Sequence, residues 1–328
     1  MTCCAATCLS RTRPVRAHRD VALSTAGHAR RKDGFALRAL RVGVHPDALV
    51  LRSGTDVIVR TPARPDHRDG NVVDLLAPPP AEEVATRLEG VRRLMEPVGV
   101  SHLHVRYERP PGRPDDPARA AAFAASGCTL DVLRVLALEA AALPEAAIAP
   151  PASVTIERLD GPDGDVIAGR RWYAAAVLDR YAHGDDVEAW RGWDVEWGAW
   201  DRERVTALAR AGRAEVWLAS RHGMPVATLT LVDDRDGLVV VEDVVTHPAH
   251  RRRGIGRALL VTALASLRGS RSLEHVAIAT RPGAPSEALY ADLGFAPVAD
   301  VHPWLRMAPT VEPPSSASPA EGRSQRRR

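Results

Sequence analysis

Several features that mark common protein classes are scarce in this sequence. Lys32 is its only lysine, and Phe, Trp and Tyr together make up 4% of its 328 residues. Its 44 Lys and Arg nearly balance 41 Asp and Glu, so it lacks the basic excess of a dedicated nucleic-acid binder. No apolar run approaches the roughly 18–20 residues that span a bilayer. We therefore expect a soluble protein whose partners include neither nucleic acid nor membrane.

The four cysteines are too unevenly spread to form a disulfide framework. Cys3, Cys4 and Cys8 crowd the N-terminus, and Cys128 stands alone in an apolar stretch. Three thiols with no second cluster of ligands do not match a zinc spacing, so we expect no metal. This cysteine usage favours a reducing compartment and predicts a cytoplasmic protein. The Ala-, Val-, Pro- and Arg-rich composition is typical of a GC-rich bacterial genome.

Length and composition predict two domains between unstructured ends. At roughly 150 residues per domain, the chain fits two domains better than one. Residues 1–40 lack sustained periodicity, and we interpret them as a disordered arm or the product of a mis-called start codon. We predict one domain over 41–148 and another over 149–308. The Pro- and Ser-rich tail at 309–328 is expected to be disordered.

One stretch of the second domain has the layout of an anion-binding turn. Leu238–Thr246 is rich in Val and predicts a buried strand, which Pro248 ends. Gly254 and Gly256 then open an amphipathic helix. The first N–H groups of a helix have no internal partner and carry the positive end of its dipole, and glycines let phosphate oxygens approach the backbone.

The spacing of this turn distinguishes between the known phosphate-binding motifs. No GxxxxGK[ST] is present, and Leu259 stands where the third glycine of G-x-G-x-x-G belongs. The R-x-x-G-x-G from Arg251 to Gly256 resembles the coenzyme A pyrophosphate loop of the GNAT superfamily of N-acetyltransferases. Downstream, "PSEALYADLGF" is similar to the family signature A-x-x-L-Y-x-x-x-G-F, with Ser286 where the family prefers Ala.

The resemblance covers roughly residues 153–308 and implies a fold and a co-substrate. The fold class is α/β (α+β), with a central mixed, mostly antiparallel sheet flanked by helices and a splayed pair of parallel strands. The co-substrate is acetyl-CoA, whose acetyl group and pantetheine arm would be flanked by Val244, Val245 and Thr246. The residues implied around the pyrophosphate are Arg251, Arg252, Arg253, Gly254, Ile255, Gly256 and Arg257.

The resemblance also implies catalytic roles. Tyr290 stands where family members use a tyrosine as the general acid that protonates the leaving thiolate. For the base we favour Glu242, because strand alternation places it on the same face as Val244 and Thr246. Asp243 and a water molecule stay open as alternatives. One departure is Gly283, which occupies a position where the family often has Asn.

The acceptor is expected to be a primary amine, on a small molecule or on a protein. Trp190, Trp193, Trp197 and Trp200 fall on one helical face, either as a core stripe or as a wall of the acceptor site, with acidic residues nearby to attract a cation. The acidic residues are Asp186, Asp194 and Glu196. Monomer and homodimer both remain open.

Residues 41–148 run through the same order of elements without the chemistry. Aligning Gly127 with Gly294 places Phe123 on Tyr290, and a phenyl ring has no proton to donate. The loop after the first strand is "APPP", whose prolines lack backbone N–H donors. We interpret this half as a GNAT-like domain that kept its fold and lost its cofactor site.

The leading hypothesis is an acetyl-CoA-dependent N-acetyltransferase in which the amine attacks the thioester directly. One alternative is a non-catalytic acyl-CoA-binding or sensor protein on the same fold. A narrower alternative is a tandem acyltransferase similar to mycothiol synthase, which joins two GNAT domains and uses the second.

Overall fold

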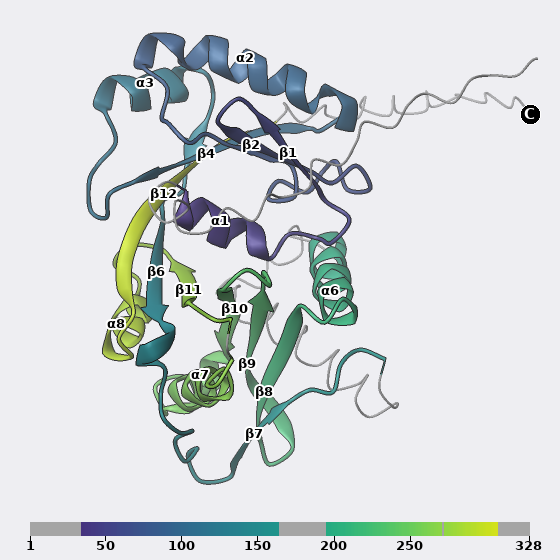
Figure 1. Cartoon of the computed structure of the whole chain (residues 1–328), viewed down its shortest axis with the longest axis vertical. Helices are drawn as coiled ribbons and strands as arrows, with labels where there is room; N and C mark the ends of the chain where they lie inside the picture. Colours follow the sequence, from purple (N-terminus) through teal and green to yellow (C-terminus); the bar gives the residue numbers. More distant parts are fainter. Residues whose placement is uncertain (1–33, 164–194, 271, 308–328) are drawn as a thin grey trace, which may run out of the picture. The chain divides into compact units, whose positions relative to one another are not determined.

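The computed structural model describes residues 34–163, 195–270 and 272–307 (Figure 1). In the first half, the helices and strands are α1 (Phe35–Val42), β1 (Leu49–Ser53), β2 (Asp56–Arg60), β3 (Val72–Asp74), η2 (Ala81–Glu83), α2 (Val84–Met95), η3 (Glu96–Val98), β4 (His102–Arg109), α3 (Pro117–Ala125), β5 (Thr129–Leu130), β6 (Leu133–Glu139) and η4 (Ala140–Ala142). In the second half, they are β7 (Val154–Arg158), α6 (Val195–Arg210), β8 (Ala214–Arg221), β9 (Met224–Asp233), β10 (Leu238–Thr246), η5 (Pro248–His250), α7 (Ile255–Ser266), β11 (His275–Thr280), α8 (Pro285–Asp292) and β12 (Ala296–Met307).

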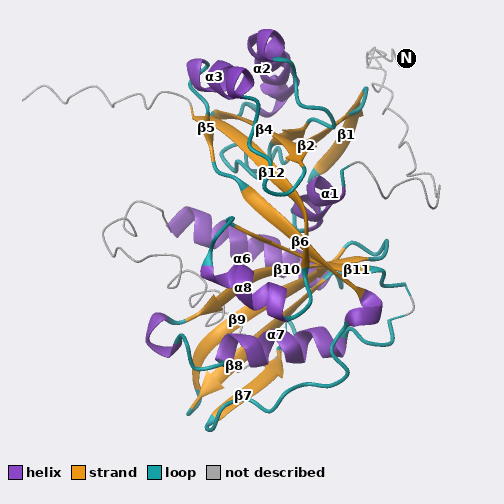
Figure 2. Cartoon of the chain, turned by 90° about the vertical axis from the view of Figure 1, so that its left-hand side faces the viewer, coloured by secondary structure: helices purple, strands orange, loops and turns teal. Residues whose placement is uncertain are grey.

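The described strands form one mixed, mostly antiparallel sheet flanked by helices (Figure 2). The strand order is β1-β2-β3-β4-β12-β6-β11-β10-β9-β8-β7, and β5 pairs with β12 beside that path. Two neighbouring pairs are parallel, β3 with β4 and β10 with β11. Each parallel pair is bridged by a helix, α2 in the first half and α7 in the second. The predicted fold class is confirmed.

The last strand of each half pairs with the other half. β6 follows the helices of the first half, yet it lies between β11 and β12. β12 ends the second half and pairs with β4 along its whole outer length, from Asp300↔Arg109 to Met307↔His102. The sheet is therefore continuous across the predicted boundary at 148 and 149, and the boundary itself stays a prediction.

A separate apolar cluster packs under a helix in each half of the sheet. In the second half, α7 packs on β8, β9 and β10 through Leu260, Ala263 and Leu264, which are fully buried as the helical spacing predicts. In the first half, α2 buries one apolar stripe, formed by Val84, Leu88, Val91 and Met95. Both helices owe their stability chiefly to this burial of one apolar face.

The helix α1 covers the opposite face of the sheet and corrects the prediction for residues 1–40. Residues 35–40 belong to α1, where Ala36 and Leu37 are buried against Val240 of β10 and Val301 of β12. An isolated helix of eight residues is unstable in water, so its sequence signal is weak and tertiary packing decides its structure. Residues 1–33 and the tail predicted at 309–328 lie outside the described residues.

Candidate functional site

The parallel strands β10 and β11 separate partway along their length. Their pairing runs from Leu238↔His275 to Val241↔Ile278. Beyond that point β10 continues against β9 alone, up to Thr246↔Ala227, and β11 continues against β6. Among the described residues, the backbone of 242–246 is thereby left without a strand partner on one side, in the middle of a sheet.

A β-bulge changes the direction of the side chains at this opening. The register with β9 shifts between Glu242 and Val245, and Asp243 has a φ of +53°. An extra residue in one strand breaks the alternation of side chains. Val244 consequently packs against the cluster under α7, whereas Glu242 lies on the other face, against α1 and α6. The prediction that Glu242 and Val244 share a face is wrong for this reason.

The turn after β10 brings the start of α7 close to the end of the strand. Gly254 is the N-cap of α7 and has a φ of +77°, and it offers no side chain to cap the first turn. At Gly256 a Cβ atom would lie 3.0 Å from the Thr246 hydroxyl oxygen, so a larger residue would push the helix start away from the strand. The first N–H groups of α7 are thus presented beside the opening.

The basic residues of this turn differ in their surroundings. Arg251, Arg252 and Arg253 are exposed, and the Arg251 Nε donates a hydrogen bond to the Thr246 carbonyl oxygen at 3.1 Å. Arg257 lies 3.6 Å from the Asp292 carboxylate. The side chain of Ile255 is buried in the cluster under α7. Exposed guanidinium groups next to a helix N-terminus favour a bound anion.

Tyr290 lies on α8 and belongs to the cluster under α7, with 4% of its surface exposed. Its ring centroid is 6.2 Å from that of Phe295. Burial raises the pKa of its phenol to about 12, and a hydrogen bond with Ser286 opposes that shift. The phenol is therefore protonated throughout the physiological range. Gly294 follows α8 with a φ of +92°, a left-handed conformation that glycine adopts readily at the end of a helix.

A buried arginine that the sequence analysis missed holds both acidic residues of the bulge. The Arg204 NH1 of α6 donates to the Glu242 Oε2 at 2.8 Å and to the Gly43 carbonyl oxygen at 2.6 Å. Its NH2 lies 3.6 Å from the Asp243 Oδ2. Arg204 precedes the buried Leu208 by four residues on α6, and a charged residue on the buried stripe of a helix is the signal that could have found it.

The corresponding region of the first half is closed. Its parallel pairs Val73↔Val105 and Asp74↔Arg106 are followed by a hydrogen bond from the Leu75 N–H to the Arg106 carbonyl oxygen at 2.7 Å. β3 and β4 are therefore joined as far as Leu75 and Arg106, and β4 continues to Arg109 against β12.

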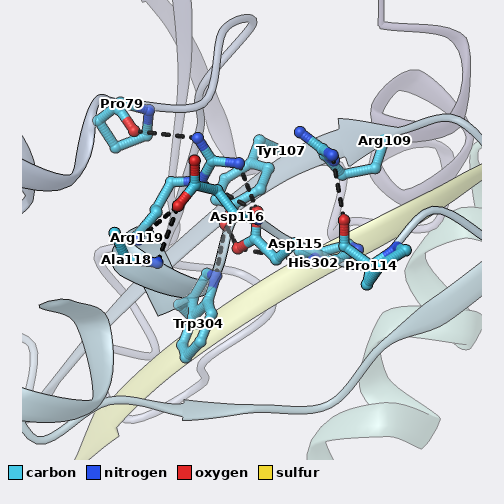
Figure 3. A network of polar contacts seen from close by, with 10 residues as sticks. All are labelled: Pro79, Tyr107, Arg109, Pro114, Asp115, Asp116, Ala118, Arg119, His302 and Trp304. Atoms are coloured by element: carbon cyan, nitrogen blue, oxygen red, sulfur yellow. Dashed lines mark hydrogen bonds and ion pairs between the residues drawn. The ribbon is translucent and has the colours of Figure 1, made fainter. Parts of the chain in front are cut away.

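Buried side chains fill the space beside this closed pair (Figure 3). Tyr107 donates to the Asp115 carboxylate and accepts a hydrogen bond from the Trp304 indole N–H at 2.8 Å. Arg119 pairs with Asp115 and reaches the carbonyl oxygen of Pro79 at 3.4 Å, in the loop predicted to lack phosphate-binding groups. Phe123 stacks on Trp304 with 4.6 Å between ring centroids.

Most of the residues predicted around the acceptor lie outside the part of the chain that the structure describes. Asp186, Trp190, Trp193 and Asp194 lie outside them, as do the side chains of Glu196, Trp197 and Trp200. Within the described ranges, His, Cys, Asp and Glu do not gather in threes that could hold a metal ion. Within the same ranges, the helices are too short or too polar to cross a membrane.

Comparisons with known proteins show similarities in sequence and in fold. Residues 185–295 match the sequence model of the acetyltransferase (GNAT) family. The fold is similar to that of a functionally unknown conserved protein from Staphylococcus epidermidis, with 12% identity, a TM-score of 0.63, and 80% of this chain and 95% of that chain covered. A GCN5-related N-acetyltransferase from Kribbella flavida has 19% identity and a TM-score of 0.54, with 83% and 92% covered.

A tandem GNAT protein from the clavulanic acid biosynthesis pathway has 19% identity and a TM-score of 0.50, with 84% of this chain and 89% of that chain covered. At these identities the likeness to solved structures is one of fold. None of the curated proteins matches the sequence.

Proposed function

The chain carries a domain of the acetyltransferase (GNAT) family, and on that premise we propose that it is an acetyl-CoA-dependent N-acetyltransferase acting on a primary amine. The observation that carries the proposal is the opening between β10 and β11, which faces the start of α7. An unpaired strand edge can bind the amides of a pantetheine arm, and an uncapped helix start next to exposed arginines can bind a pyrophosphate. Gly256 keeps the two features close together.

The proposed reaction needs a proton donor and a proton acceptor. The amine nitrogen attacks the thioester carbonyl carbon, and the carbon–sulfur bond breaks as the new amide forms. Tyr290 gives its phenolic proton to the departing thiolate, and its raised pKa keeps that proton in place until then. Glu242 takes the proton that the amine loses, directly or through a water molecule. Asp243, whose carboxylate shares Arg204, is the alternative acceptor for that proton.

In this proposal the first half has a supporting role. Its closed strand pair and its buried Tyr107–Asp115–Arg119 network leave it without an equivalent opening in the described residues. We further propose a cytoplasmic bacterial enzyme, monomeric or homodimeric, whose acceptor amine belongs to a small molecule or to a protein. A sugar amine, as in a mycothiol-synthase-like enzyme, is one member of that class.

A binding and turnover experiment with the full chain tests the proposal. Calorimetry with acetyl-CoA is expected to show tight binding, and a panel of primary amines is expected to release free coenzyme A thiol. Gly256→Val serves as the variant with a damaged coenzyme site, and Gly90→Val in α2, where a Cβ meets nothing within 4 Å, as its control. Binding without turnover on any amine would favour an acyl-CoA sensor, and absence of binding would contradict both functions.

A further inference from the structure

The C-terminal end of α1 lies directly against the bulge of β10. Gly43 follows α1, and a Cβ atom built on it would lie 1.9 Å from the Glu242 Oε1 and 2.6 Å from its Oε2. The carboxylate of Glu242 therefore occupies the space where any other residue at position 43 would place its side chain. Because Gly43 has a φ of −83°, its backbone conformation is open to alanine, and the contact with Glu242 is what disfavours a side chain there.

Arg204 contacts Gly43 and both acidic residues of the bulge, Glu242 and Asp243. One nitrogen of its guanidinium donates both to the Gly43 carbonyl oxygen and to Glu242, and the other nitrogen faces Asp243. Arg204 is buried, so its position is fixed by packing and by these carboxylates and not by solvent. A planar guanidinium with several fixed donors restricts the orientation of a carboxylate more than an ammonium group does.

The end of α1 is fastened by a second arginine that does not reach the acids. The Arg213 NH2 donates to the Val42 carbonyl oxygen at 2.9 Å, and its Nε donates to the Asp233 carbonyl oxygen. Leu37 and Val42 anchor the helix in the apolar cluster on this face of the sheet. The two arginines thus differ in their contacts, since Arg213 joins α1 to the end of β9 whereas Arg204 also holds Glu242.

We propose that Gly43 and Arg204 are positioning residues that fix the Glu242 carboxylate at the β10 bulge, which makes α1 part of the active site. α1 spans the predicted start of the first domain at residue 41 and lies outside the matched residues 185–295, so the catalytic centre is completed by a segment far away in the sequence. This inference rests on the proposed function, because Glu242 is the proposed proton acceptor. Proton transfer requires the carboxylate within hydrogen-bond reach of its partner, and a shift of about 1 Å costs on the order of 10²-fold in rate.

Gly43→Ala is a selective test, because the added methyl group meets the end of a flexible side chain. We expect kcat to fall on the order of 10- to 100-fold, while the KM for acetyl-CoA stays within about twofold of the wild-type value. Gly90→Ala is the matched control, since a Cβ at Gly90 meets nothing within 4 Å. In the Glu242→Gln background Gly43→Ala is expected to cause no further loss, because it acts through that carboxylate.

The second pair of variants separates positioning from folding. Arg204→Met is expected to lower kcat to a similar extent, and Arg213→Met to lower only the melting temperature. Equal kcat losses in both arginine variants, or an undiminished Gly43→Ala effect in the Glu242→Gln background, would overturn the proposal.

A crystal structure of the Gly43→Ala variant tests the position of the Glu242 carboxylate without relying on turnover. The Glu242 carboxylate is expected to leave Arg204 while the backbone of β10 stays in place, and an unmoved carboxylate would overturn the proposal. If the wild-type protein binds acetyl-CoA but acetylates no amine, the proposed function fails. The crystal structure still tests whether Gly43 and Arg204 fix the Glu242 carboxylate.

Discussion

Replacing Tyr290 by Phe separates the chemistry of the proposed site from its packing. Burial raises the pKa of this phenol from 10.0 to about 12, so the interior disfavours the phenolate by about 3 kcal/mol relative to water. The protonated form is the one that acts as an acid. Its contribution to kcat is therefore present below the folded-state pKa and is lost only as the pH rises through about 12.

Two results follow for the Tyr290→Phe variant. Its kcat is expected to fall by about 10²–10⁴-fold, as for loss of a general acid, at every pH between 6 and 10. Its melting temperature is expected to change little, because the ring stays in its cluster and only the hydrogen bond with Ser286 is lost. Release of coenzyme A thiol at saturating substrates measures the first quantity, and calorimetry measures the second.

Tyr107→Phe is the matched control in the first half. Tyr107 is also fully buried, and its hydroxyl group bonds Asp115 and Trp304 in the first-half cluster, which does not include Tyr290. Its removal is expected to cost about 1.5–3 kcal/mol of stability, because a charged acceptor loses its donor, and to leave kcat unchanged. Wild-type turnover in Tyr290→Phe would refute the assignment. A fall in the kcat of the wild-type protein near pH 10 that is absent in Tyr290→Phe would also refute the assignment, since the phenol would then ionise like an exposed tyrosine.

Three further predictions concern the backbone and the buried polar groups. Gly254→Ala is expected to raise the KM for acetyl-CoA several-fold because a φ of +77° is strained for alanine, whereas Gly99→Ala, with a φ of +71° and open space around it, serves as a control that leaves KM unchanged. Burial lowers the pKa of His104 to about 4, so the unfolded chain takes up a proton first, and about 3 kcal/mol of stability is expected to be lost as the pH falls from 6.5 to 4. Urea titrations at each pH should show a smaller loss in His104→Gln, and an identical loss would contradict the assignment. Arg119→Met is expected to lower the melting temperature by leaving Asp115 without its ion pair, and an unchanged value would contradict that role.

Side-chain patterns in the sequence predict the helices and strands whose structure depends on residues within a single element. The Val-rich strand Leu238–Thr246 and the buried stripe of α2 follow from side-chain periodicity, because burial of one face decides both. The Gly254 turn follows from the need for a positive φ next to a helix start. These features depend on the order of residues within a single element, which is the information that a sequence presents directly.

The features that the sequence did not predict depend on contacts between distant residues. The bulge at Asp243 depends on how β10 meets β9, and strand alternation gives no warning of it. The contact of Gly43 with Glu242 joins residues about 200 positions apart, and neither residue type is unusual where it stands. Arg204 is recognisable only once the buried stripe of α6 is known, and part of that helix lies next to residues outside the described ranges.

Each half contributes its last strand to the other half, because β6 pairs with β11 and β12 pairs with β4. This pairing gives a physical reason why the first half is retained. β6 of the first half pairs with β11 from His275↔Glu139 to Thr280↔Arg134, and so supports the strand that forms one side of the opening in the second half. Without β6, the edge of β11 would be exposed, and unpaired strand edges favour misassociation. The hydrogen bond from the Leu75 N–H to the Arg106 carbonyl oxygen joins β3 to β4 in the first half, and it leaves the pairing of β6 with β11 unaffected. The sheet therefore couples the two halves through backbone pairing, so selection for the geometry around β11 also retains the first half.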